Sequence, residues 1–324
     1  MIWLILIPLL VVATALSIVV GPGGGVSLPA LMETDPQTAW LILTEIRLPS
    51  VVTGLLVGFV LGVSGAALQG FLRNPLAEPG TLGTAGGAAL GAVATFHFGF
   101  VGLGVLALPL GGIAGALAAL MLVVLLAGRN ASTTTLILAG IAMSLFTGAA
   151  TTLLLNLAPN PFAVYEVLFW TMGSVTDRSW EHVFILLPCA LIGLAVVMAQ
   201  ARSFDALTLG EEAATSLGVN MARLRFAVVI GTGISVGAAV AVAGVIGFVG
   251  LIVPHIVRPL MGHAPGRSLV PSGIAGALLV TLADIAARLV ETSGEPLRLG
   301  VLTGLMGAPF FLWLIMRTRR KGST

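Results

Sequence analysis

The sequence predicts an all-α, polytopic integral membrane protein with about ten transmembrane helices. Of its 324 residues, 57% are hydrophobic and only 9% are charged, and the mean hydropathy is +1.10. A soluble domain carries about 25% charged residues, so no soluble fold could cover this much apolar surface. Lipid is therefore the solvent in which the helices fold. Residues 1–324 are expected to form a single transmembrane domain.

Apolar runs long enough to cross a hydrocarbon core of ~30 Å give nine clear helices. The run from Phe226 to Leu260 is too long for one crossing, and Gly247, Gly250 and Pro254 interrupt its second half. Glycine and proline at these positions predict a separate short helix. The ten expected helices lie near residues 1–20, 48–72, 81–98, 101–127, 135–157, 182–200, 226–246, 249–262, 268–290 and 299–316.

The distribution of basic residues sets the expected topology, because Lys and Arg concentrate on the cytoplasmic side of membrane proteins. If ten helices begin inside, only four of the 15 basic residues face out, namely Arg47, Arg178, Arg288 and Arg298. Without the short helix, all later loops would be inverted and this bias would weaken. Both termini are therefore expected in the cytoplasm. The basic residues are scattered, so they predict no nucleic-acid surface.

Small residues recur within the expected helices. Gly54, Gly58, Gly62 and Gly65 follow one another at spacings of four, four and three, which lets helix backbones approach closely in lipid. There is also a weak internal sequence repeat. Residues 63–65 (Val-Ser-Gly) end ten residues before Pro75, and the similar residues 242–244 (Val-Ala-Gly) end ten residues before Pro254. The two copies are five helices apart and thus in opposite orientations, which predicts an inverted-repeat core.

Two cytoplasmic segments could carry mechanism. Within 202–225, residues 207–218 form a short helix with Glu211 and Glu212 in its first turn and Gly218 at its end. Such a helix could dock into a groove on another protein, or it could simply lie solvated at the interface. The segment 72–80 contains two prolines and is a candidate gate or a rigid turn.

Other functions would each need particular residues in this sequence. A Walker A loop requires a lysine after glycine, and the chain's only lysine is Lys321 in its tail, so no ATPase activity is expected. Ion coupling usually needs acidic groups at mid-depth, and Asp284 is the main candidate. An intramembrane serine protease would need Ser64, in a Gly-x-Ser-Gly sequence, beside His255. One cysteine, Cys189, provides neither a disulfide nor a metal cluster.

Five motifs, in this order along the chain, resemble the FecCD family of permease subunits of type II ABC importers. The likeness runs from about residue 40 to the C-terminus. The motifs are Arg47-Leu48-Pro49, Ser64-Gly65-Ala66-Ala67-Leu68-Gln69, Asn74-Pro75-Leu76-Ala77-Glu78-Pro79-Gly80, Gly247-Phe248-Val249-Gly250-Leu251-Ile252-Val253-Pro254-His255 and Gly307-Ala308-Pro309-Phe310-Phe311.

The resemblance implies a multi-pass protein of the bacterial inner membrane that works with other chains. Two cytoplasmic ABC ATPase subunits would use ATP and Mg, whereas this chain would bind no cofactor and no metal. A periplasmic or extracellular substrate-binding protein would deliver cargo, and a second permease copy or a close paralogue would complete the pathway. The expected cargo is siderophore-bound iron first, then haem, then cobalamin. An ion-coupled secondary transporter and the protease remain the alternatives.

The resemblance also implies roles for individual residues. The 207–218 segment would be the coupling helix, with Leu209, Gly210, Glu211, Glu212, Ala213, Ala214, Leu217 and Gly218. The cytoplasmic gate would include Asn74, Leu76, Ser132, Thr133, Thr134 and Thr135. Arg47 and Arg288 match arginines that dock the binding protein, although they could instead only mark the external helix ends. The family often carries a second arginine where this chain has Ser50, which puts that docking contact in doubt.

Overall fold

The computed structural model describes residues 2–21, 28–104, 106–128, 133–158, 161–292 and 295–322. Each of the ten predicted segments coincides with a helix in the described residues, which confirms the predicted fold class. These helices are α1 (Trp3–Val19), α4 (Leu48–Phe71), α5 (Thr84–His97), α6 (Ala107–Ala127), α7 (Thr133–Asn156), α9 (Trp180–Met198), α12 (Met221–Ala243), α13 (Val249–Leu260), α14 (Pro265–Leu289) and α15 (Leu299–Gly322).

Shorter elements connect them. The described connections contain α2 (Leu28–Thr34), α3 (Pro36–Leu41), the π-helix η2 (Ile42–Arg47), the 3-10 helix η3 (Phe100–Leu103), α8 (Pro161–Thr171), α10 (Ala201–Leu207) and α11 (Glu211–Ser216). Two-residue strands, β1 (Glu291–Thr292) and β2 (Glu295–Pro296), pair antiparallel between α14 and α15. α3, η2 and α4 run on as one helical stretch, Pro36–Phe71.

Helix length and hydropathy agree with a membrane protein. In the described residues six helical stretches are long and apolar enough to cross a membrane, and α1, α13 and the apolar part of α15 are shorter apolar helices. Polar residues mark several helix starts. Asp35 precedes Pro36 and accepts a hydrogen bond from the Thr38 N–H at 3.1 Å, and Asn220 accepts one from the Arg223 N–H at 2.9 Å.

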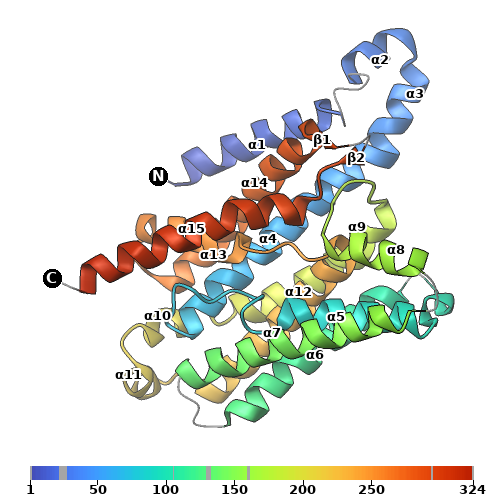
Figure 1. Ribbon diagram of the computed structural model, residues 1–324. Helices are drawn as coiled ribbons and strands as arrows, with labels where there is room; N and C mark the ends of the chain where they lie inside the picture. The colour runs from blue at the N-terminus through green and yellow to red at the C-terminus, as the bar shows by residue number, and fades with distance from the viewer. Residues whose placement is uncertain are drawn as a thin grey trace.

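The two ends of the bundle differ in what they carry. In Figure 1 both chain ends lie toward the end of the bundle that holds α10 and α11. α2, α3 and α8 lie at the opposite end. The start of α1, the end of α15 and α11 thus lie toward one end of the bundle, and the membrane side that this end faces stays a prediction.

The most extensive helix packing joins α4 to α14. A Cβ atom added to Gly58 would lie 2.4 Å from the Gly276 carbonyl oxygen, and one added to Gly62 would lie 2.1 Å from the Ser272 carbonyl oxygen. Gly65 meets Gly250 of α13 in the same way. The glycine spacing therefore serves backbone contact between helices, as predicted.

Replacing Gly62 by alanine should destabilise the protein by about 1–3 kcal/mol, because the new methyl group forces α4 and α14 apart. Thermal unfolding of the detergent-purified chain measures this loss. Gly148→Ala is the matched control, since an added Cβ at Gly148 in α7 meets nothing within 4 Å among the described residues. Equal stability of the two variants would show that the α4–α14 contact tolerates an extra atom.

The packing of α4 and α12, the two helices that the predicted inverted repeat would relate, corresponds in part. α4 packs on α14 and α13, and α12 packs correspondingly on α6 and α5. α4 and α12 also contact each other near the centre of this arrangement. The weak internal sequence repeat does not mark equivalent positions, however. α4 continues past Gly65 to Phe71, whereas α12 ends at Ala243, directly before Gly244.

Candidate functional site

Of the predicted coupling segment 207–218, only Glu211–Ser216 form a helix, α11, which projects from the bundle in Figure 1, whereas Leu207 ends α10. α11 begins after Gly210, whose φ of +103° suits glycine. Ala214 is fully buried, whereas Leu209 and Leu217, which flank the helix, are 68% and 65% exposed. Two large exposed apolar side chains on a projecting helix are a typical protein-docking feature. The segment therefore has the shape and surface that docking needs.

A second short helix, α10, holds α11 to the bundle, and the sequence reasoning did not identify it. Phe204 and Leu207 of α10 are fully buried. Their i, i+3 spacing is the signal that could have indicated an amphipathic turn. α10 contacts α4, α14 and α11, so it joins the projecting helix to two long spans.

The candidate gate segment 72–80 lies in the set of turns, residues 72–83, that connects α4 to α5. The Asn74 side chain accepts a hydrogen bond from the Leu76 N–H at 2.9 Å, so Asn74 shapes the turn itself. The half-buried Glu78 accepts one from the Phe248 N–H at 3.1 Å, directly before α13. The Ser144 hydroxyl of α7 donates to the Gly80 carbonyl at 2.9 Å. The segment is thus attached to both α13 and α7.

The other predicted gate residues lie at the start of α7. Ser132 falls outside the described residues, and Thr133 begins the helix. The side chains of Thr134 and Thr135 are exposed. The contacts that the structure shows between residues 72–83 and α7 involve Gly140, Met143 and Ser144, further along that helix. The gate assignment remains a prediction.

Glu78 gives the gate segment a measurable pH dependence. Burial raises its pKa from 4.5 to about 7, and the hydrogen bond from Phe248 opposes that shift. Between these two pH values the folded state binds more protons than the unfolded state, so stability falls as pH rises through this window.

Glu78→Gln should therefore remove most of this pH dependence. The amide oxygen can still accept the Phe248 N–H, and no buried charge forms at high pH. Its melting temperature should exceed that of the unmodified protein at pH 8 and match it at pH 5. Glu33→Gln, at an exposed position in α2, is the control and should leave the dependence unchanged. An identical pH profile for Glu78→Gln and the unmodified chain would contradict this account.

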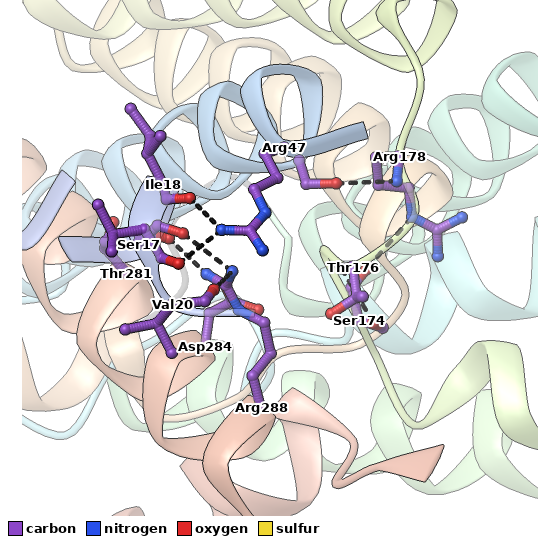
Figure 2. Close-up of polar contacts among 12 residues, drawn as sticks. Ser17, Ile18, Val20, Arg47, Ser174, Thr176, Arg178, Thr281, Asp284 and Arg288 are labelled. Atoms are coloured by element: carbon purple, nitrogen blue, oxygen red, sulfur yellow. Dashed lines mark hydrogen bonds and ion pairs between the residues drawn. The ribbon is translucent and has the colours of Figure 1, made fainter. Parts of the chain in front are cut away.

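Arg47 and Arg288 lie near their helix ends, as predicted, but they are buried, at 8% and 7% exposure. Figure 2 shows both guanidinium groups turned toward Ser17–Val20 at the end of α1. Arg47 donates to the carbonyls of Ile18 and Val19, the latter at 2.6 Å. Arg288 donates to the carbonyls of Ser17 and Val20, both at 3.0 Å.

The physical reason for this burial is the unsatisfied end of α1. The last carbonyls of a helix lack intrahelical donors and carry partial negative charge, so cations are favoured there. Arg288 also forms an ion pair with Asp284 and a hydrogen bond to the Ser17 hydroxyl. Both side chains are therefore already bonded within the chain, and docking of a binding protein by Arg47 and Arg288 stays a prediction. They fasten α1 to α4 and α14.

A cavity of about 320 Å³ lies beside these arginines. Arg47, Ser50, Asp177, Asp284 and Arg288 contribute its polar lining, with Ile42 and Ile46 as apolar walls. A partner's acidic side chain would have to enter this cavity to reach either guanidinium group. Ser50 accepts a hydrogen bond from the Arg178 N–H at 3.3 Å, so it is used within the chain.

The residues that a serine protease or an ion-coupled carrier would use do not have the arrangement that those functions need. The Ser64 hydroxyl is buried without a hydrogen-bond partner in the described part of the chain, so it forms no dyad with His255. Asp284 is paired with Arg288 near the end of α14 instead of standing alone at mid-depth. Within the described ranges no cluster of three His, Cys, Asp or Glu residues could hold a metal ion.

Comparisons with known proteins agree on one family. Residues 9–317 match the FecCD transport family. The vitamin B12 import system permease BtuC of Citrobacter koseri is 39% identical over 86% of this chain and 84% of the relative. The ABC transporter permease YvrB of Bacillus subtilis is 38% identical over 93% and 84%. A solved structure described as an inward-facing metal-chelate type ABC transporter aligns with a TM-score of 0.84 and 32% identity, over 96% of this chain and 97% of that one.

Proposed function

The chain belongs to the FecCD transport family and is the permease subunit of a type II ABC importer, and from this premise we propose that it carries a bulky metal chelate, cobalamin foremost, across the bacterial inner membrane. The observation that carries the proposal is the similarity to vitamin B12 permeases over most of the chain. This similarity makes cobalamin the first candidate cargo, before siderophore-bound iron and haem, which the sequence analysis placed first and second. Because the chain belongs to an ABC permease family, the hypotheses of an ion-coupled carrier and of an intramembrane protease are set aside.

An importer permease of this kind implies a separate ATPase and a substrate-binding protein. We place α11 against the cytoplasmic ATPase dimer, which binds ATP and Mg, and the α2, α3 and α8 end toward the binding protein. Both termini are then cytoplasmic. The exposed apolar Leu209 and Leu217 support this orientation, because they suit a protein groove on the ATPase.

A second copy of the chain would complete the pathway. α7 supports this arrangement, because only 22% of the residues in its most apolar stretch of 18 are buried. Its exposed side carries both threonines and leucines, namely Thr134, Thr135, Thr152, Leu138 and Leu145. A polar and apolar mixture suits a wall that faces a large cargo better than one that faces lipid alone. The gate residues Asn74, Leu76 and Ser132–Thr135 would lie at its cytoplasmic end.

Docking of the binding protein by Arg47 and Arg288 stays a proposal in altered form. The hydrogen bonds described for Arg47 use only its Nη1, so its Nη2 can meet a carboxylate that enters the adjoining cavity, whereas Arg288 already uses both Nη atoms within the chain. The partner must therefore supply a protruding acidic side chain instead of a flat acidic surface.

The cargo assignment is tested by competition. Vesicles containing the permease and its ATPase are supplied with binding protein loaded with cobalamin, a ferric siderophore or haem, and the cargo taken up is measured. Cobalamin should accumulate inside and compete with itself when unlabelled. Accumulation of the ferric siderophore or haem without cobalamin would overturn the assignment while leaving the importer function intact.

A further inference from the structure

The cytoplasmic start of α14 depends on another helix for its cap. The residue before the helix is Ala264, which has no side-chain acceptor, and Pro265 follows it. The first amides of a helix need acceptors from outside. Here the Gly266 N–H donates to Asp205 Oδ1 of α10 at 2.7 Å. A carboxylate in this position also interacts favourably with the positive end of the helix dipole.

The backbones of α10 and α14 touch at the same point. A Cβ atom added to Gly266 would lie 2.0 Å from the Ala201 carbonyl oxygen. The fully buried Phe204 fills the space between α10 and α4, where a Cβ on Gly70 would meet both Pro265 and Phe204. We name this contact of Gly70, Ala201, Phe204, Asp205 and Gly266 the cytoplasmic joint. Close packing leaves it little room to slide.

The joint lies between the projecting helix and the most extensively packed helix pair, α4 and α14. α11 follows α10 through a short turn, in which the Thr208 hydroxyl donates to the Asp205 carbonyl at 2.7 Å. On the other side, α14 is locked to α4 by the backbone contacts of Gly58 and Gly62. A displacement of α11 therefore reaches α4 and α14 through α10.

We propose that Asp205 is a positioning residue for energy coupling: its hydrogen bond to Gly266 makes α10 and the α4–α14 pair one rigid body that follows the coupling helix α11. This inference rests on the proposed role of α11 as the contact with the ATPase. Asp205 touches neither cargo nor nucleotide. Its removal should let α11 move without moving the spans, so ATP would be hydrolysed without transport.

The test measures cargo taken up per ATP hydrolysed in vesicles that contain the permease, its ATPase and the loaded binding protein. Asp205→Ala and Asp205→Leu, which lack an acceptor, should lower this ratio about ten-fold while ATP hydrolysis continues. Asp205→Asn keeps an acceptor oxygen and should stay close to the unmodified ratio. Asn220→Ala removes a comparable helix cap from α12, outside the joint, and should leave the ratio unchanged.

A second measurement keeps the proposal testable if these variants fold poorly. Spin labels at the exposed positions Arg202 in α10 and Arg267 in α14, with Cys189 replaced by serine, report the distance across the joint. That distance should be the same with and without ATP. A change in it, an unchanged coupling ratio in Asp205→Ala and Asp205→Leu, or equal loss in Asp205→Asn would overturn the proposal. Absence of ATP-driven uptake in the unmodified system would instead overturn the proposed function.

Discussion

Replacing Leu209 and Leu217 together by glutamate is expected to lower ATP-driven uptake about a hundred-fold, since large buried anchors contribute most of the binding energy at protein interfaces. Both side chains are largely exposed and flank α11, whereas Ala214 between them is turned inward. Carboxylates at these two positions would bring unpaired charge into an apolar groove on the ATPase. The ATPase should then fail to co-purify with the permease.

The control for this prediction is the pair Leu209→Met and Leu217→Met, which keeps the apolar surface and should retain both assembly and uptake. Because the two leucines are exposed, neither pair should alter the melting temperature of the isolated permease. Normal uptake by the glutamate pair would show that α11 is a solvated interfacial helix, and the coupling assignment would be wrong.

Arg288→Met is expected to cost about 3–5 kcal/mol of stability, because it leaves a buried carboxylate without its partner. Asp284 is only 6% exposed and is paired with Arg288. The carbonyls of Ser17 and Val20 at the end of α1 lose their donors as well. Thermal unfolding should show the loss. Arg267→Met, at an exposed position in the same helix, should show almost none.

A double-mutant cycle separates the two parts of this effect. Asp284→Asn in the Arg288→Met background should recover part of the stability, because no buried charge remains, while the end of α1 stays uncapped. If Arg288→Met unfolds at the same temperature as the unmodified chain, the guanidinium group is not the structural fastener described above. It would then be available to the binding protein.

The positions of the helices could be predicted from sequence because lipid forces a simple rule on each segment, although only six described helical stretches are long and apolar enough to cross a membrane by themselves. Long apolar stretches without charge must be helices, and Gly247, Gly250 and Pro254 signalled the separate short helix α13. The projecting α11 was also predictable, since Glu211 and Gly218 mark its ends.

Contacts between distant segments could not be predicted in the same way. Arg288 contacts Ser17, which lies 271 positions earlier in the sequence, and no pattern in either segment predicts this contact. From sequence alone Arg288 is therefore a candidate for docking a partner, whereas in the structure its guanidinium group binds Ser17, Val20 and Asp284. Asp205 was overlooked for the same reason, because the helix start that it caps lies 61 positions away.

The most direct test of the account is uptake by vesicles that contain only the permease and its ATPase, with loaded binding protein outside and nucleotide inside. The account predicts cargo accumulation with ATP and Mg, none when the ATPase is made unable to hydrolyse ATP, and no effect of dissipating proton or sodium gradients. Accumulation that follows an imposed ion gradient in vesicles without the ATPase would contradict it.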